Sequence, residues 1–165
     1  STYFTRTKKN YLYSTFDYAT YDKDGYFYIL GRTDDVINVS GHRLGTREIE
    51  ETIQLYENVA ETTVVGVFDS VKGQVPIAFI VLKTQDMNNE SKKNNEVLKI
   101  QSLVNKKLGP FARPDHIYFV SMLPKTRSGK LLRRAIKAVL ENREVGDLTT
   151  LEDPSSLDEI RRVIS

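Results

Sequence analysis

The pattern of apolar and polar residues along the chain predicts several strands. Residues 1–20 mix polar and aromatic side chains and are expected to supply an edge strand. Asp22-Lys23-Asp24-Gly25 signals a turn, because glycine accepts the positive φ that follows a type I turn. The strand predicted at 26–30 completes a hairpin with the residues before that turn. Further apolar runs predict strands at 59–68, 74–83 and 117–120.

Helical spacing appears in the segments between these strands. Ile49 and Ile53 lie four residues apart, and Thr46 is expected to cap this helix through about residue 57. Val97, Ile100, Val104 and Leu108 form a second stripe, which Gly109-Pro110 should end. Further helices are expected at 131–140, which is basic and amphipathic, and at 157–163.

Three stretches lack such periodicity. Residues 31–45 are predicted to be rich in loops, and residues 84–96 to be a polar loop rich in asparagine and lysine. The tail from Gly146 is expected to be loosely packed. The order of elements predicts an α+β fold, a small domain with a mostly antiparallel sheet flanked by helices and preceded by a hairpin.

The composition of the chain excludes several classes of function. The 165 residues include no cysteine, which excludes disulfides and thiolate metal sites, and two histidines, His42 and His116, offer little for zinc. We therefore expect no metal ligands. A net charge of +2 argues against a dedicated nucleic-acid binder. No run approaches the ~20 apolar residues of a membrane span, so a soluble cytoplasmic protein is expected.

Two stretches carry the candidate chemistry. In the first, Gly31 to Gly45 followed by Glu48-Ile49-Glu50, the guanidiniums of Arg32 and Arg43 can bind ribose or phosphate oxygens, and Gly41 permits close approach of a ligand. On composition alone, a solvated joint with surface arginines is the simpler interpretation. In the second, Leu123 to Arg134, Lys130 follows Ser128-Gly129 and can neutralise a carboxylate or phosphate. A solvated basic helix face is the alternative there.

Together these stretches resemble the C-terminal signatures of the adenylate-forming superfamily. The shared pattern is Gly-Arg-x-Asp-Asp, then Gly-His-Arg, Glu-Ile-Glu and Pro-Lys-Thr-x-Ser-Gly-Lys, in that order. Gly41 to Thr46 and the tail Leu148 to Pro154 are most similar to short-chain, AMP-forming acyl-CoA synthetases. Within that group the chain resembles propionyl-CoA synthetases most and acetyl-CoA synthetases next.

The resemblance implies a domain division and a reaction. Residues 1–33 are identified as the terminal hairpin of a large N-terminal adenylating domain, and 34–165 as a mobile C-terminal domain that is inert alone. The family converts a short-chain carboxylate, here propionate or acetate, with ATP and CoA to acyl-CoA, AMP and pyrophosphate through an acyl-adenylate. Mg²⁺ is expected to be bound mainly by the N-terminal domain. The partners implied are that domain and the substrates.

The resemblance also implies roles for single residues. They are Lys130 as the catalytic lysine between carboxylate and α-phosphate, Asp17 and Arg32 at the ribose, Asp34 as the hinge, Arg43 at the ATP phosphates, and Ser40 and Gly41 along the CoA pantetheine. Lys130 is further expected to be a target of a lysine acetyltransferase and deacetylase, since acetylation would remove its charge.

Two departures from the family pattern concern these roles. Many relatives have Thr-Gly-Asp where this chain has Thr15-Phe16-Asp17. Relatives of the acetate type place an arginine for the CoA 3′-phosphate where this chain has Asn105, followed by Lys106 and Lys107.

Two other functions are compatible with the sequence. One is the lid of an adenylation domain that passes its acyl group to a carrier protein. The other is a stand-alone anion-binding module whose basic residues are Arg127, Lys130, Arg133, Arg134 and Lys137.

Overall fold

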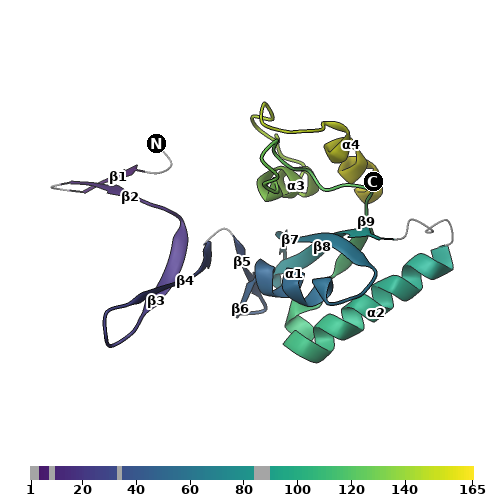
Figure 1. Cartoon of the computed structure of the whole chain (residues 1–165), viewed down its shortest axis with the longest axis horizontal. Helices are drawn as coiled ribbons and strands as arrows, with labels where there is room; N and C mark the ends of the chain where they lie inside the picture. The colour runs from purple at the N-terminus through teal and green to yellow at the C-terminus, as the bar shows by residue number, and fades with distance from the viewer. Residues whose placement is uncertain (1–3, 8–9, 33–34, 84–89) are drawn as a thin grey trace. The chain divides into compact units, whose positions relative to one another are not determined.

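A computed structural model describes residues 4–7, 10–32, 35–83 and 90–165. It divides the chain into two compact units, Ser1–Val36 and Ile37–Ser165, each described below by itself (Figure 1). Asp34, the expected hinge, lies outside the described residues.

The first unit consists of two antiparallel strand pairs. β1 (Phe4–Arg6) pairs with β2 (Tyr11–Tyr13), and β3 (Asp17–Tyr21) pairs with β4 (Phe27–Arg32). The stretch expected to be one edge strand is therefore broken into β1, β2 and most of β3. The predicted hairpin turn is present, with Gly25 at φ 86° and the Asp22 carboxylate accepting the Asp24 and Tyr26 backbone N–H groups.

Large apolar side chains of this unit are exposed. They are Phe4, Tyr11, Leu12, Tyr13, Tyr21, Tyr26, Phe27, Tyr28 and Ile29. Every buried apolar side chain among the described residues belongs to the second unit. The strand pairs thus form without a core of their own, and hydrogen-bonded turns define them locally.

The second unit is built around a mixed sheet. Its strands are β5 (Val36–Val39), β6 (His42–Gly45), β7 (Val59–Asp69), β8 (Gly73–Leu82) and β9 (His116–Phe119). The order is β6-β5-β8-β7, and β9 pairs with β8 in parallel. The β7–β8 pair is antiparallel over its whole length, so the expected mostly antiparallel sheet is confirmed.

Residues 31–45, expected to be loop-rich, instead contribute β5 and β6. Ile37 and Val39 alternate toward the core, and Ser40-Gly41 closes a two-residue turn with φ of 50° and 86°. Positive φ at both central residues matches the right-handed twist of paired strands. β5 is only four residues long, so the alternation is too short to stand out in the sequence.

Helices cover both faces of the sheet. They are α1 (Thr46–Gln54), α2 (Glu90–Leu108), α3 (Arg133–Leu140) and α4 (Ser155–Ile164), with a short 3₁₀ turn, η2 (Pro110–Ala112). Successive side chains of a strand point to opposite faces. Val64 of β7 accordingly joins a cluster with α1 and α2, and Val65 joins a cluster with α3 and α4.

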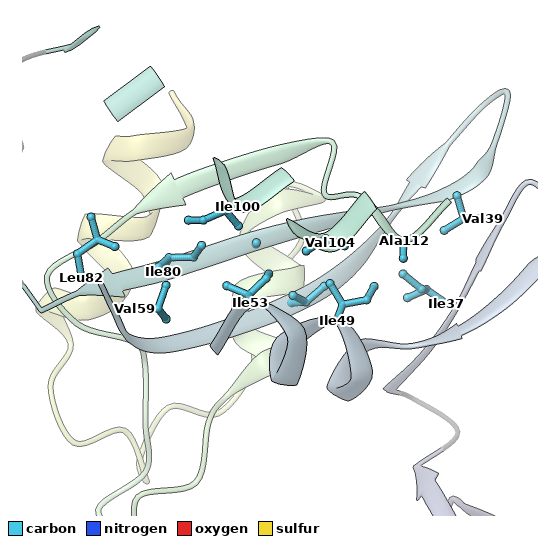
Figure 2. Close-up of a cluster of buried hydrophobic side chains, with 12 residues drawn as sticks. Ile37, Val39, Ile49, Ile53, Val59, Ile80, Leu82, Ile100, Val104 and Ala112 are labelled. Atoms are coloured by element: carbon cyan, nitrogen blue, oxygen red, sulfur yellow. The ribbon is translucent and has the colours of Figure 1, made fainter. Parts of the chain in front are cut away.

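The first cluster contains twelve buried residues (Figure 2). Ile49 and Ile53 of α1 meet Ile80 of β8 and Ile100 and Val104 of α2, as the helical spacing predicted. Figure 1 shows α1 and α2 on one side of β7 and β8, with α3 and α4 on the other. The unit therefore has three layers, helix–sheet–helix.

Several helix boundaries differ from the predictions. α1 ends at Gln54 and not near residue 57, and α3 begins at Arg133 and not at residue 131, because the Lys130 loop extends through Leu132. α2 begins at Glu90, so residues 90–96, expected to be loop, are helical; the pairs Glu90–Lys93 and Glu96–Lys99 support these turns. Residues 84–89 lie outside the described part. Thr46 does not cap α1: Gly45 occupies the cap position, and the buried Thr46 hydroxyl has no hydrogen-bond partner among the described residues.

The tail from Gly146 is well packed, contrary to expectation. Leu151, Leu157 and Ile160 are 5%, 1% and 0% exposed and belong to the cluster beneath α3. Asp153 and Pro154 lead into α4, and the Asp153 carbonyl accepts the Ser156 hydroxyl at the start of this helix.

Candidate active site

Lys130 lies at the end of a tight hairpin loop. Lys125 and Leu131 form an antiparallel bridge, and the Thr126 N–H donates to the Lys130 carbonyl at 2.8 Å. The Thr126 hydroxyl accepts the Lys130 N–H at 3.1 Å and lies 2.9 Å from the Ser128 hydroxyl. Gly129 takes φ 80°, a region that favours glycine. Pro-Lys-Thr-x-Ser-Gly-Lys is therefore a sequence that folds into this loop by local hydrogen bonds.

The loop is anchored on both sides. On one side the tail pairs with it: Thr126 bridges to Leu151, and the Glu152 N–H donates to the Lys125 carbonyl at 2.9 Å. On the other side the Leu132 N–H donates to the Pro124 carbonyl at 2.9 Å immediately before α3 begins. A rigid backbone thus presents the side chain of Lys130.

The Lys130 side chain itself is exposed and makes no hydrogen bond or ion pair with any described residue. The neighbouring cation Lys125, in contrast, is held by Glu61 of β7 at 2.7 Å. A compact ammonium on a flexible stem that is left unneutralised by its own unit is suited to an external anion.

Ser40 and Gly41 form the turn between β5 and β6. The Ser40 N–H donates to the Lys72 carbonyl at 2.7 Å, which fixes this turn against the β7–β8 turn. A Cβ atom at Gly41 would meet nothing within 4 Å. The space over Gly41 is therefore open in this unit, and the turn can accept a ligand that passes close to the backbone.

Arg43 follows on β6 and is exposed, and its neighbour Leu44 packs on the α1–α2 cluster. Leu131, beside Lys130, packs on the α3–α4 cluster. The turn with Ser40 and Gly41 and the loop with Lys130 therefore adjoin different helical layers of the same sheet. The structure groups Ser40, Gly41 and Arg43 and keeps the Lys130 loop in the other layer.

An aromatic pair beside Gly41 was not foreseen from the sequence. The His42 ring stacks on Phe111 of η2 with centroids 3.8 Å apart. Because 69 positions separate the two residues in the chain, no local pattern could have indicated this contact.

Asp17 and Arg32 meet within the first unit. They are register partners of β3 and β4, with the Arg32 guanidinium 3.7 Å from the Asp17 carboxylate and donating to the Thr15 carbonyl at 3.3 Å. Phe16 before them adopts φ 58°. This left-handed region favours glycine, so Phe16 adopts a backbone conformation that its side chain disfavours.

Asn105, Lys106 and Lys107 are exposed in the last turns of α2. Within the described residues, no three His, Asp or Glu side chains are grouped as metal ligands. The described helices include none long and apolar enough to cross a membrane.

Comparison with known proteins places this geometry in a family. The signature of the AMP-binding enzyme C-terminal domain matches residues 48–130. The chain is 55% identical to a propionate–CoA ligase of Salmonella typhimurium, covering 93% of this chain and 24% of the relative. It is 49% identical to an acetyl-coenzyme A synthetase of Pyrobaculum aerophilum, covering 88% and 21%. The chain thus spans about a quarter of the length of the curated relatives it matches.

Solved structures agree with this assignment. An acyl-CoA synthetase of Brucella canis matches with a TM-score of 0.61 and 32% identity, over 84% of this chain and 25% of that one. The ATP-bound RpMatB-BxBclM chimera B1 matches with a TM-score of 0.67 and 26% identity, over 82% and 26%. The loops that carry Gly41 and Lys130, the helix–sheet–helix unit beneath them and the matching signature all agree: this chain belongs to the AMP-binding enzyme C-terminal domain family.

Proposed function

We propose that this chain is the C-terminal part of an AMP-forming acyl-CoA synthetase that acts on propionate or acetate. One observation carries the proposal: two loops with the family's motifs lie in different layers of one domain, one with an unpaired lysine and the other with an open glycine turn. The names of the relatives, propionate–CoA ligase and acetyl-coenzyme A synthetase, support the substrates.

In the first step, a carboxylate oxygen of the acid attacks the α-phosphorus of ATP. A P–O bond to the acid forms, the bond to pyrophosphate breaks, and acyl-adenylate results. Both reactants are anionic, and the Lys130 ammonium offsets their repulsion at the point of attack. Asp17 and Arg32 contact the ribose, and Arg43 contacts the phosphates.

In the second step, the sulfur of CoA attacks the acyl carbonyl carbon. The thiol loses its proton, the C–S bond forms, and AMP leaves. The turn of Ser40 and Gly41 lines the path of the pantetheine. Because this turn and Lys130 lie in different layers, one rotation about a hinge at Asp34 exchanges the two at the same site.

The domain division belongs to the same proposal. Residues 1–33 form the terminal hairpin of the adenylating domain, which agrees with their exposed aromatic side chains, and 34–165 form the mobile domain. The rest of the longer protein binds adenine, the acyl group and Mg²⁺. Residues 1–165 alone are inert.

The unpaired Lys130 ammonium is also accessible to a lysine acetyltransferase, and a deacetylase would restore it. Mass spectrometry of the protein isolated from its cells should find acetyl-Lys130, and acetylated protein should fail in the first step only.

The test uses the full-length parent with Lys130→Ala. Adenylate formation from propionate and ATP should fall by about a thousandfold or more, because the charge acts in the transition state. Thioester formation from propionyl-adenylate and CoA should survive. Arg127→Ala removes an exposed cation from the same loop and is the matched control, with both half-reactions retained.

Other outcomes identify the alternatives. If Lys130→Ala leaves adenylate formation intact, the proposed role is wrong. If the parent acylates a carrier protein and not CoA, the domain is an adenylation lid. The anion-binding module is disfavoured, because Arg133 and Lys137 of the basic helix are paired with Glu50 and Glu141.

A further inference from the structure

A buried carboxylate connects the two helical layers of the second unit. Glu50 lies on α1, and its side chain is 11% exposed. Its Oε1 accepts the Val64 N–H at 2.8 Å, the Thr63 hydroxyl at 3.2 Å and Arg133 Nε at 3.1 Å. Its Oε2 accepts Arg133 Nη2 at 2.7 Å. All the donors of this cluster converge on one carboxylate.

The position of Glu50 in the sheet explains these partners. β7 is an edge strand, so outward-pointing N–H groups such as that of Val64 have no neighbouring strand to bind. Glu50 satisfies this group from α1, on one face of the sheet, and holds Arg133 of α3, on the other. The carboxylate therefore passes around the sheet edge and ties the two layers together.

Arg133 requires such a partner for a further reason. It is the first residue of α3, and the first turn of α3 contains no acidic residue. A cation there is disfavoured by the positive end of the helix dipole. No side chain caps this helix either. The Glu50 carboxylate supplies the missing negative charge, in the fork-like geometry that fixes a guanidinium best.

Lys130 is three residues before Arg133, and the Leu132 N–H is hydrogen-bonded back to Pro124. The direction of the loop therefore depends on where α3 begins. The pair of Lys125 with Glu61 holds the other flank of the loop. The two cations are almost equally exposed, but the Glu61 carboxylate is 44% exposed against 11% for Glu50, so this pair contributes less.

We propose that Glu50 is a positioning residue for Lys130: through Arg133 it fixes the start of α3 and thereby the place of the ammonium during adenylate formation. This inference rests on the proposed function. It concerns a motif residue that touches neither substrate nor reacting atoms. It predicts that loss of the pair slows adenylate formation specifically, and that this defect is distinct from a general loss of stability.

The experiment uses Glu50→Gln and Arg133→Lys in the full-length parent. Glu50→Gln retains an acceptor for Val64 but loses the charged fork. Arg133→Lys leaves the Glu50 bonds to Thr63 and Val64 in place and so keeps the core intact. Each should lower kcat of adenylate formation by about tenfold at saturating substrates, since small misplacements of a catalytic group are costly. The KM for ATP and thioester formation from propionyl-adenylate should change by less than about twofold.

The double variant should be no slower than the slower single variant, because both act through one pair. Glu96→Gln is the matched control: its carboxylate is 14% exposed and holds α2, away from the Lys130 loop. It should lower the thermal midpoint of unfolding without lowering adenylate formation.

Equal loss of both half-reactions, unchanged adenylate formation, or additive effects in the double variant would each overturn the inference. Measuring Lys130→Ala in parallel distinguishes a failure of the positioning role from a failure of the proposed function. If Lys130→Ala abolishes adenylate formation while Glu50→Gln and Arg133→Lys do not reduce it, only the positioning role is wrong. If Lys130→Ala has no effect, the proposed function fails first.

Discussion

Single residues of the second unit combine unusual backbone conformations with exposed positions. Gly41 has φ 86° and open space where a Cβ would lie, and Lys130 follows Gly129 at φ 80°. Gly66 differs: a Cβ there would lie 2.1 Å from Ile37 Cγ2, so this glycine serves packing. The surroundings thus distinguish Gly41, which we propose to line a ligand path, from Gly66, which packing requires.

Gly41→Leu tests the pantetheine path. The leucine should slow thioester formation by at least about a hundredfold while adenylate formation persists. The reason is that its side chain would occupy the open space that we propose for the pantetheine. A residue other than glycine at positive φ destabilises the fold by about 1–3 kcal/mol through backbone strain. The control variant must therefore introduce the same strain. Gly146→Leu, at φ 76° with equally open surroundings, should leave both half-reactions unchanged. Equal losses in the two variants would refute the path.

At the scale of elements, α2 is held by a polar cluster. The Glu96 carboxylate accepts the Tyr56 hydroxyl at 3.0 Å and pairs with Lys99 at 3.2 Å. Burial by itself raises the pKa of Glu96, but hydrogen bonds from Tyr56, Lys99 and Asn58 outweigh it and hold this pKa below its ordinary value of 4.5. Desolvation and the same carboxylate raise the pKa of Tyr56.

A carboxyl group whose pKa is lower in the folded state stabilises the fold at higher pH. This contribution is present above pH 4.5 and is lost as the pH falls through the folded-state pKa. Circular dichroism of urea unfolding should therefore show the gap in unfolding free energy between the 165-residue chain and its Glu96→Gln variant shrinking below pH 4.5. A gap that stays constant or widens on acidification would show that the cluster does not stabilise α2 as described.

The helical elements were predicted better than their ends. The spacing of Ile49 and Ile53 and of Ile100 and Val104 is a local signal, and all four side chains are buried in one cluster as expected (Figure 2). The start of α1 was wrong, because Gly45 takes the cap position in place of Thr46. β5 and β6 were missed, because their pairing depends on β8 and on the Lys72 carbonyl, which are distant in the sequence.

For the whole molecule, we propose that the two loops in different layers act in turn at one site. Under the same proposal, they exchange by a rotation about Asp34 in the segment between the strand pairs and the sheet. Asp34→Pro in the full-length parent should leave adenylate formation intact and slow thioester formation by at least about tenfold, because proline fixes its own φ and restricts the residue before it.

Asp34→Ala is the control for this prediction. It removes the same carboxylate but keeps the backbone free, so both half-reactions should persist. If alanine is as harmful as proline, the carboxylate itself is required, and residue 34 is not a hinge in the sense proposed.

The sequence by itself determined the family and the fold class, and it supplied the residues for which we propose chemical roles. Motifs such as Pro-Lys-Thr-x-Ser-Gly-Lys are local: they encode a turn, its hydrogen bonds and an unpaired cation within a few positions. The apolar stripes that predict the helices are local as well, because their residues also lie within a few positions of one another.

Only the tertiary structure decided which residues support the motifs. Long-range contacts brought Arg133 to Glu50, 83 positions apart, and His42 to Phe111. They also packed Leu151 and Ile160 of the tail into the cluster beneath α3, where a loosely packed segment was expected. Burial and pairing depend on which faces meet, and a one-dimensional pattern does not specify that when the partners are many residues apart.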